Sequence, residues 1–554
     1  MVARPARRFR HGRADRSAFA GETLLEALSR DGVPKVVRSV RYHRPRGPFC
    51  GTGDCTGCLV RVNGRPNVRA CVHPVGDGDR VDRGNGWPSA SFDLLGAIDL
   101  VTPHGIDTLR GFRRPAWAHG LYHRVIRRLA GYGEAPDSAA GTAIVTGPRA
   151  VETEVAVIGA GASGRAAAER LRERGVPVQL IDRNREIAPI DRVDTLPGTT
   201  ITFVPPPSSK EERPFTLLGF EAPGRGVVVR SRSIVLATGS YDASLLFGGN
   251  DRPGVVAAEL ALRWARPGRS SPLRRAIVVG GGARAAEVID RLGRSVRAVV
   301  APTEIGPEVA RRASDLGIAL YPRSLILRAN GRSRVRSLDL RGRGGGPRFS
   351  LAADSVILAH RRVPSNQLAV QSGAALAWRA DPGAYFPAAT PAGATTVPGL
   401  YAVGSVGGFD PEDSAASGTR AADALVDPTG PVATAETTPS AATGELEGYY
   451  RELLRERRSG KWIACACEDV LLEEVERASA AGFRGIEVVK RYTGLGTGLC
   501  QGRYCLPDAL LLLAIQEQRP PAEVGRITQR PPAVPTPLAA FAALSGEFPS
   551  EAID

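Results

Sequence analysis

The sequence is poor in several residue types, and each shortage excludes a class of protein. Its 554 residues include one methionine. They contain no run of about 18 apolar residues, so we expect no membrane-spanning helix. The first 20 residues contain arginines but no apolar segment, which argues against a secretory signal. Hydrophobic residues (43%) and charged residues (23%) are present in ordinary proportions, so a mainly disordered or fibrous chain is excluded. We therefore expect a cytoplasmic protein of two to four domains.

Lysine is also scarce, since only four of the 73 basic residues are lysine. The net charge is +16, and residues 1–50 contribute half of it. A basic face there could steer an acidic partner or nucleic acid, but a solvated surface is the simpler interpretation. No basic stretch is interleaved with aromatic residues, so we predict no nucleic-acid partner.

Cysteine is absent between residues 71 and 465, which excludes a redox-active disulfide in the middle of the chain. The eight cysteines instead form two groups of four near the two ends of the sequence. Because no secretory signal is expected, we do not expect these cysteines to form a disulfide framework. Two sites with four thiolates each account for every cysteine.

The first group has the spacing C-x4-C-x2-C-x12-C and consists of Cys50, Cys55, Cys58 and Cys71. A triplet of this spacing with a distant fourth cysteine is typical of plant-type [2Fe–2S] ferredoxins. A structural zinc site is the alternative. The glycines between the first three cysteines favour the iron–sulfur cluster, because they let backbone amides approach its sulfides.

The second group has two cysteine pairs separated by an amphipathic stretch, expected to be helical, at residues 470–481. The pairs are Cys465 with Cys467, and Cys500 with Cys505. Two loops that each supply two thiolates can hold zinc or a [2Fe–2S] cluster, and the spacing leaves this open. The glycine-rich approach to Cys500 favours the cluster.

A dinucleotide-binding unit begins at Glu154. We expect a strand over 155–158, a helix over 166–174 and a second strand over 178–181. The turn between the first strand and the helix reads G-x-G-x-x-G, with its glycines at Gly159, Gly161 and Gly164. Such glycines allow a pyrophosphate to approach the helix N-terminus, and Asp182 stands where a carboxylate accepts from ribose hydroxyls.

A second unit of the same kind begins at Ala276. Its turn contains Gly280 and Gly282, with alanine as the third small residue. The following strand ends in Ala301-Pro302 and offers neither a carboxylate nor an arginine for a ribose. We expect a Rossmann-like fold here. Two alternatives remain equally open: the domain binds NAD(P), or the fold is retained with an empty nucleotide site.

Several blocks resemble the sarcosine oxidase alpha-subunit family. They lie before and within the first cysteine group, in the stretch 111–131, at Asn250 to Val255, and around both pairs of the second group. By architecture the chain is most similar to flavin–iron–sulfur subunits of hydrogen cyanide synthase, opine oxidase and hydroxyproline dehydrogenase, with the ferredoxin-like piece fused to the flavoprotein piece. The resemblance covers nearly the whole chain.

The resemblance implies FAD at the first glycine turn, with Thr238, Gly239 and the region of Gly404 and Ser405 completing the site. It also implies two [2Fe–2S] clusters and a partner subunit of the D-amino-acid-oxidase type that oxidises an amine. An additional FMN at the subunit interface is known in the family. Three features depart from the family pattern: Ser405 replaces the usual aspartate, a pair of glycines is missing near Arg185, and the first flavin half is short, with 74 residues between Gly164 and Gly239.

The expected fold class is α/β and multidomain. Two Rossmann-like domains, arranged as in glutathione reductase, are flanked by an N-terminal β-grasp [2Fe–2S] domain and a small helical C-terminal [2Fe–2S] domain. The expected order is a ferredoxin-like domain (1–95), a connector (96–150), the first segment of the FAD-binding domain (151–240), an NAD(P)-binding-like domain (241–385), the second segment of the FAD-binding domain (386–430), a linker helix (431–460), the C-terminal cluster domain (461–520) and a Pro-rich tail (521–554).

Three functions are compatible with these patterns. The first is an electron-transfer subunit of a heteromeric amino- or imino-acid dehydrogenase or oxidase, an FAD-dependent enzyme of CH–NH or CH–NH2 donors with an unknown electron acceptor. The second is a self-contained NAD(P)H:acceptor reductase, which rests on the second glycine turn. The third is a scaffold subunit with a degenerate flavin site, which rests on Ser405 and on the shortened first flavin half. No catalytic residue is identified, because no acid–base pair or nucleophilic triad is present.

Overall fold

The computed structural model describes residues 6–32, 37–83, 86–87, 92–105, 117, 120, 147–209, 211–221, 224–266, 271–427, 444–458 and 460–547. The chain divides into two compact units. The first unit comprises residues 1–141, 242–361 and 443–526, and the second comprises residues 142–241, 362–442 and 527–554. Most of the expected connector and the beginning of the expected linker helix lie outside the described residues.

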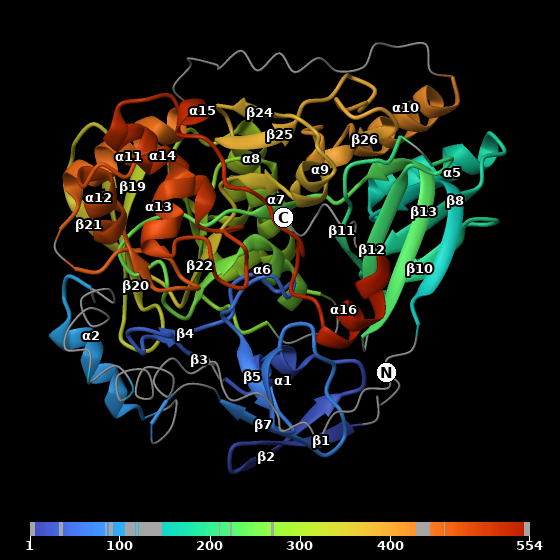
Figure 1. Ribbon diagram of the computed structural model, residues 1–554. Helices are drawn as coiled ribbons and strands as arrows, with labels where there is room; N and C mark the ends of the chain where they lie inside the picture. The colour runs from blue at the N-terminus through green and yellow to red at the C-terminus, as the bar shows by residue number, and fades with distance from the viewer. Residues whose placement is uncertain are drawn as a thin grey trace. The chain divides into compact units, whose positions relative to one another are not determined.

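The first unit begins with a five-stranded sheet of order β2-β1-β7-β5-β6 (Figure 1). Helix α1 (Leu24–Arg30) buries its leucines against this sheet and starts with a capping box between Thr23 and Glu26. The strands are β1 (Ala6–His11), β2 (Ala14–Phe19), β5 (Leu59–Val62), β6 (Arg65–Arg69) and β7 (Asp79–Arg83). Two short helices, η1 (Leu94–Ala97) and α2 (Ile98–Val101), follow.

The sequence also predicts a strand over 36–42, but the strand that forms is shorter. Only β3 (Val37–Arg38) forms, and it pairs with β4 (Pro45–Arg46). The chain leaves the strand conformation because the backbone amides of Arg41 and Tyr42 donate to the Asp469 carboxylate instead of to a neighbouring strand.

The middle of this unit is a parallel sheet of order β15-β22-β16-β17-β18. Its strands and helices are β15 (Val255–Ala257), α6 (Ala258–Trp264), β16 (Ala276–Val279), α7 (Ala283–Leu292), η4 (Gly293–Ser295), β17 (Val296–Val300), α8 (Pro307–Leu316), β18 (Ala319–Tyr321) and β22 (Ser355–Leu358). The antiparallel strands β19 (Ser324–Asn330), β20 (Ser337–Gly342) and β21 (Arg348–Ala352) form a separate sheet. The sequence also predicts strands over 298–300 and 355–359, and both are confirmed as β17 and β22.

The C-terminal region of this unit is helical, and Figure 1 shows its helices gathered together. It contains α11 (Glu445–Glu456), β27 (Ile463–Cys465), β28 (Val470–Leu471), α12 (Leu472–Ala480), α13 (Ile486–Thr493), α14 (Leu506–Glu517) and α15 (Pro521–Val524). The amphipathic helix expected over 470–481 is confirmed as α12. One hydrophobic core runs from the N-terminal sheet into the parallel sheet, because buried Leu24 and Val60 belong to the same cluster as Val278 and Ile357.

The second unit is built on a sheet of order β10-β9-β8-β13-β12-β11, with β26 paired to β13. Its elements are β8 (Arg149–Ile158), α5 (Ala162–Glu173), β9 (Val178–Asp182), β10 (Asp194–Pro197), β11 (Thr199–Phe203), β12 (Phe215–Glu221), β13 (Arg225–Leu236), β14 (Ser240–Asp242), β23 (Arg362–Pro364), α9 (Gln367–Gln371), β24 (Leu376–Arg379), β25 (Ala384–Pro387), β26 (Leu400–Ala402), η5 (Gly404–Val406), α10 (Ser414–Val426), α16 (Leu538–Leu544) and η6 (Ser545–Glu547). The expected strand–turn–helix–strand order is confirmed, although α5 starts four residues earlier because the glycine turn forms its first turn.

Two segments of this unit differ from the expected boundaries. Residues 362–385 lie in it, because Leu368, Ala369 and Ala374 join its core beside β8 and β13. The supposed tail also contributes, since Leu544 of α16 is buried with Phe203 of β11. The Pro-rich sequence at 521–554 is therefore partly folded structure.

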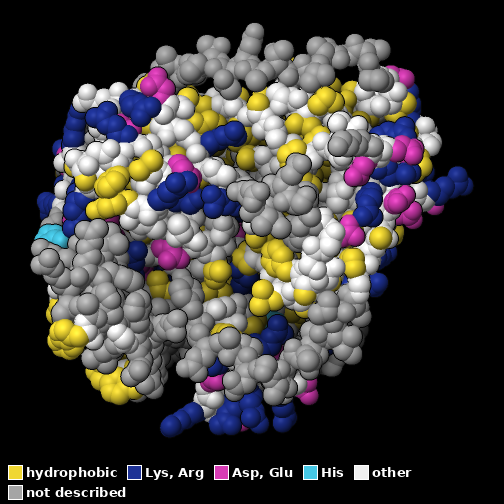
Figure 2. Space-filling model, viewed as in Figure 1, with side chains coloured by type: hydrophobic (Ala, Val, Ile, Leu, Met, Phe, Trp, Pro, Cys, Tyr) yellow, Lys and Arg dark blue, Asp and Glu magenta, His cyan; other side chains and the backbone are white. Residues whose placement is uncertain are grey.

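The solvated surface expected for the basic N-terminal segment is found over β1 and β2, but not at Arg46, which is buried. Arginine side chains gather over β1 and β2 at the lower edge of Figure 2, where Arg7, Arg8, Arg10 and Arg13 are exposed. In the part of the chain that the structure describes, no helix combines the length and the apolar character needed to cross a membrane.

Candidate functional site

The first cysteine group lies in the loop before β5, with its fourth member just after β6. All four thiols are buried. The Cys50 thiol interacts with those of Cys55 and Cys71, and the Cys58 thiol also interacts with Cys71. Burial raises the pKa of Cys50, but hydrogen bonds from Cys55 and Cys71 outweigh it and hold this pKa well below its ordinary value. The sequence spacing thus brings the four predicted ligands together.

The second group is assembled from the β27–β28 hairpin and the loop that ends at the N-terminus of α14. The Cys465 thiol pairs with Cys505, and the Cys467 thiol pairs with Cys500. A hydrogen bond from Cys505 lowers the pKa of Cys465 to about 7. Gly498 lets the two loops meet, because a Cβ there would overlap the Cβ of Cys467.

Both groups have the donor chemistry and the arrangement that suit a [2Fe–2S] cluster. Such a cluster takes two thiolates on each iron, and each group brings four buried thiols together. Within the described residues, no three or more His, Cys, Asp or Glu side chains are placed to hold a single metal ion.

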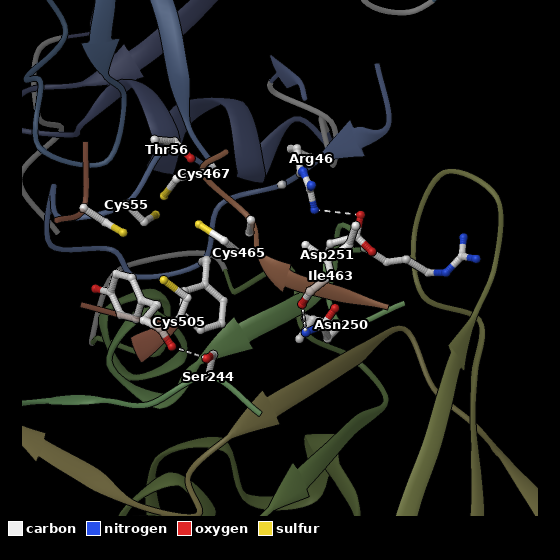
Figure 3. A pocket seen from close by; sticks show the side chains of 18 of the residues that line it. Arg46, Cys55, Thr56, Ser244, Asn250, Asp251, Ile463, Cys465, Cys467 and Cys505 are labelled. Atoms are coloured by element: carbon white, nitrogen blue, oxygen red, sulfur yellow. Dashed lines mark hydrogen bonds and ion pairs between the residues drawn. The ribbon is translucent and has the colours of Figure 1, made fainter. Parts of the chain in front are cut away.

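The two cysteine groups open onto one cavity of about 80 Å³ (Figure 3). All four cysteines of the second group line this cavity, and so does Cys55 of the first group. The loop at residues 244–252, which precedes β15, closes another side, where the Ser244 hydroxyl donates to the Tyr504 carbonyl and the Asn250 amide donates to the Ile463 carbonyl at 3.0 Å. Residues more than 400 positions apart in the sequence therefore surround a common space.

A buried ion-pair network borders this cavity. Arg46, which is 5% exposed, pairs with Asp469 and lies 2.6 Å from an Asp251 oxygen. Arg44 makes two further hydrogen bonds with Asp251, of 2.8 and 3.0 Å. Burial raises the pKa of Asp251, but the charges of Arg44 and Arg46 outweigh it and hold this pKa well below its usual range. The network joins the N-terminal module to the loop that contains Asp251 and to the C-terminal region that contains Asp469.

The first glycine turn lies at the carboxyl end of β8 in the second unit. A Cβ at Gly159 or Gly164 would overlap backbone, whereas no described atom lies within 4 Å of a Cβ at Gly161, the N-cap of α5. The Asp182 carboxylate accepts from the backbone amides of Ala160 and Asn184, each at 2.7 Å. The turn thus offers an open helix N-terminus with a carboxylate beside it, which is what a dinucleotide requires.

The other predicted flavin residues meet at the same end of this sheet. The Gly404 amide donates to Ser417 at 2.9 Å, and a Cβ on Gly404 would overlap Ser163 at the start of α5. The Ser405 hydroxyl lies 3.0 Å from that of Ser240, directly after Gly239. The Thr238 hydroxyl donates to the Ser365 carbonyl at 2.9 Å and so anchors the neighbouring loop. The three chain segments therefore converge as expected.

The second glycine turn, in the first unit, is also formed. Gly282 caps α7 with no described atom within 4 Å of its Cβ position, while Gly280 packs against the backbone of Ala359. Arg284 of α7 makes hydrogen bonds to buried Asp242 at 2.9 and 3.1 Å and to Glu259 at 3.1 Å. This arginine is thereby held by carboxylates of its own unit.

Four family models match segments of the chain. Residues 14–86 match a 2Fe-2S iron-sulfur cluster binding domain, and residues 459–545 match the sarcosine oxidase A3 domain. Residues 152–204 match an FAD binding domain, and residues 209–423 match the pyridine nucleotide-disulphide oxidoreductase family.

The relatives agree with these matches. The alpha subunit of sarcosine oxidase from Rhizobium meliloti is 27% identical over 95% of this chain and 56% of its own length. The chain is a homologue of sarcosine oxidase alpha subunits. The A subunit of opine oxidase from Agrobacterium tumefaciens is 25% identical over 71% of this chain and 92% of its own length.

A solved structure of similar fold is the L-proline dehydrogenase from P. horikoshii, with a TM-score of 0.68 and 19% identity over 97% of this chain and 98% of that chain. This homologue of alpha subunits is therefore an α/β multidomain protein with a 2Fe–2S domain and an FAD-binding oxidoreductase fold. The chain spans about half the length of the sarcosine oxidase alpha subunits it matches.

Sequence reasoning missed the ion-pair network. Arg46, Asp251 and Asp469 each lie in a block that carries the family resemblance, but nothing in the sequence indicates that the three blocks meet. The pairing of Arg284 with Asp242 was missed for the same reason.

Proposed function

We propose that this chain is the electron-transfer subunit of a heteromeric amino- or imino-acid dehydrogenase or oxidase. The observation that carries the proposal is the single cavity onto which both cysteine groups open. Each group has four buried thiols close together, as a [2Fe–2S] cluster needs. Two such sites beside one another would let single electrons pass from one cluster to the other.

The flavin completes this function. Gly159, Gly161 and Gly164 would receive the pyrophosphate of FAD, and Asp182 would accept from its ribose. Thr238, Gly239, Gly404 and Ser405 would border the same site. When bound, a flavin accepts two electrons and releases them singly, which joins two-electron substrate chemistry to one-electron clusters. The convergence of these segments supports flavin binding over a scaffold role.

The substrate-oxidising step belongs to a partner in this proposal. The relatives from sarcosine oxidase and opine oxidase are named as subunits, and we infer a partner of the D-amino-acid-oxidase type with its own FAD. An FMN at the interface with that partner fits the same scheme. Among the described residues beside the glycine turns, we identify no acid–base pair that would assist the oxidation of an amine by moving its proton.

The complex should oxidise an amine that the isolated chain leaves untouched. We expect turnover of sarcosine, L-proline or an opine with an artificial electron acceptor when the chain is purified together with its partner. The chain alone should give less than about one hundredth of that rate, because the proposal assigns amine oxidation to the partner's flavin. Equal rates for the isolated chain would contradict the partner-dependent function.

A self-contained NAD(P)H:acceptor reductase is the second candidate, and the open position at Gly282 favours it. Two observations weigh against it: Arg284 is already engaged by Asp242 and Glu259, and the chain after β17 presents Ala301 and Pro302 where a ribose partner would stand. We therefore interpret the second turn as belonging to a nucleotide-type domain with weak or no affinity for NAD(P).

A further inference from the structure

The loop of the first cysteine group touches the loop of the second directly. Asp54, which precedes Cys55, pairs with Arg503 at 3.3 Å, and both side chains are 8% exposed. Arg503 lies between Cys500 and Cys505 of the second group. Because the opposite charges of this buried pair largely cancel, the pair adds little net charge to either cysteine group.

Arg69 also reaches the first cysteine loop, but its guanidinium is placed differently. Its Nε and Nη2 atoms are shielded from solvent, and within the described part of the chain neither has a hydrogen-bond partner. The side chain crosses the loop between Cys50 and Cys55, where its Cδ lies 3.6 Å from the position that a Cβ would take on Gly53. A guanidinium withdrawn from water without a partner is costly, so this place calls for an anionic group.

The backbone around Arg69 ties it to the other two cysteines of the first group. Arg69 is the last residue of β6 and pairs with Leu59, which directly follows Cys58. The amide of Ala70 donates to the Cys58 carbonyl at 3.1 Å, and Cys71 follows Ala70 in the sequence. The side chain of Arg69 therefore starts beside two of the cysteines and extends over the loop that carries the other two.

We propose that Arg69 raises the reduction potential of the cluster at the first cysteine group and so biases an electron shared by the two clusters toward that site. The inference rests on the proposed function, in which each cysteine group holds a [2Fe–2S] cluster. A cluster held by four thiolates is anionic, and reduction adds a further negative charge. A guanidinium beside it stabilises the reduced state more than the oxidised state, most strongly where water does not screen the charge.

The same charge distinguishes the first site from the second. Arg46 and Arg503, which lie beside the second cysteine group, are both engaged by carboxylates. In the exchange between the sites, the C-terminal cluster loses one electron and the N-terminal cluster gains it, and no bond is made or broken. Arg69 therefore adds to the driving force toward the N-terminal site.

The test is an anaerobic redox titration of the full-length reconstituted protein, followed by electron paramagnetic resonance. A Cys500→Ser variant, which would lack the second cluster, assigns the two signals. Arg69→Gln removes the charge and keeps a polar side chain. At one electron per chain, we expect it to lower the ratio of reduced N-terminal to reduced C-terminal cluster about tenfold, which is ~59 mV for one electron. Arg69→Met should give the same shift, whereas Arg69→Lys should keep most of the wild-type ratio.

Arg65→Gln is the matched control, because Arg65 begins the same strand, β6, but is exposed. This variant should leave both couples in place. The proposal is overturned if the N-terminal couple is unchanged in the two neutral variants of Arg69, or if both couples fall equally. Wild-type protein without an N-terminal cluster signal would contradict the proposed function as well, whereas two cluster signals with an unmoved N-terminal couple would contradict only the role of Arg69.

Discussion

Gly161→Asp is expected to weaken FAD binding at least tenfold, about 1.4 kcal/mol, so that the protein is purified largely without flavin. Gly161 caps α5 with φ −73°, and no described atom lies within 4 Å of its Cβ position. Aspartate is a favourable N-cap, so the fold should persist. Its carboxylate, however, would occupy and repel the place of a pyrophosphate at this helix N-terminus.

Gly282→Asp is the matched control, because Gly282 caps α7 in the equivalent turn and is equally open. This variant should keep its full flavin content, since the flavin is assigned to the other turn. Flavin per protein from the visible spectrum, followed by FAD titration of the apoprotein, measures both variants. Loss of flavin from Gly282→Asp with retention in Gly161→Asp would reverse the assignment of the two turns.

Asp469→Ala is expected to destabilise the first unit by about 3–5 kcal/mol, the cost of removing one partner of a buried ion pair. The Asp469 carboxylate is fully buried, pairs with Arg46 and accepts from the backbone amides of Arg41 and Tyr42. Its removal leaves two buried amide donors unsatisfied and leaves Arg46 with Asp251 as its remaining carboxylate partner. Urea unfolding followed by circular dichroism should show a clearly lower midpoint.

Asp290→Ala serves as the control for this substitution. Asp290 pairs with Arg312 at 2.7 Å, but its side chain is 53% exposed, so its loss should cost no more than about 1 kcal/mol. Asp469→Asn keeps an acceptor for the amides and should fall between the two. Equal midpoints for Asp469→Ala and Asp290→Ala would show that the network does not hold the unit together.

Much of the site could be predicted because its signals are local. The glycine turns and the cysteine spacings are short patterns fixed by the needs of a phosphate or a cluster, and the structure brings their residues together. Helix α5 begins earlier than expected, at Ala162, since the helical geometry already starts within the turn. The apolar periodicity at 470–481 likewise sufficed to predict α12.

The remaining features depend on contacts between distant segments. The expected strand from Val36 is cut short because Arg41 and Tyr42 donate to Asp469, a residue more than 400 positions away. Residues 521–554 are expected to be a Pro-rich tail, yet Leu544 lies in a core with Phe203. No local pattern indicates that Asp54 would meet Arg503. The contact between the two cysteine loops is therefore visible only in the folded chain.

The central claim is tested most directly by an anaerobic titration of the purified full-length chain, followed by its visible spectrum. The account predicts flavin and iron–sulfur bands that are bleached by dithionite but persist with NADH or with an amine until the partner is added. Bleaching of both bands by NADH alone would establish the self-contained reductase. Bleaching by an amine alone would place substrate oxidation on this chain and contradict the account.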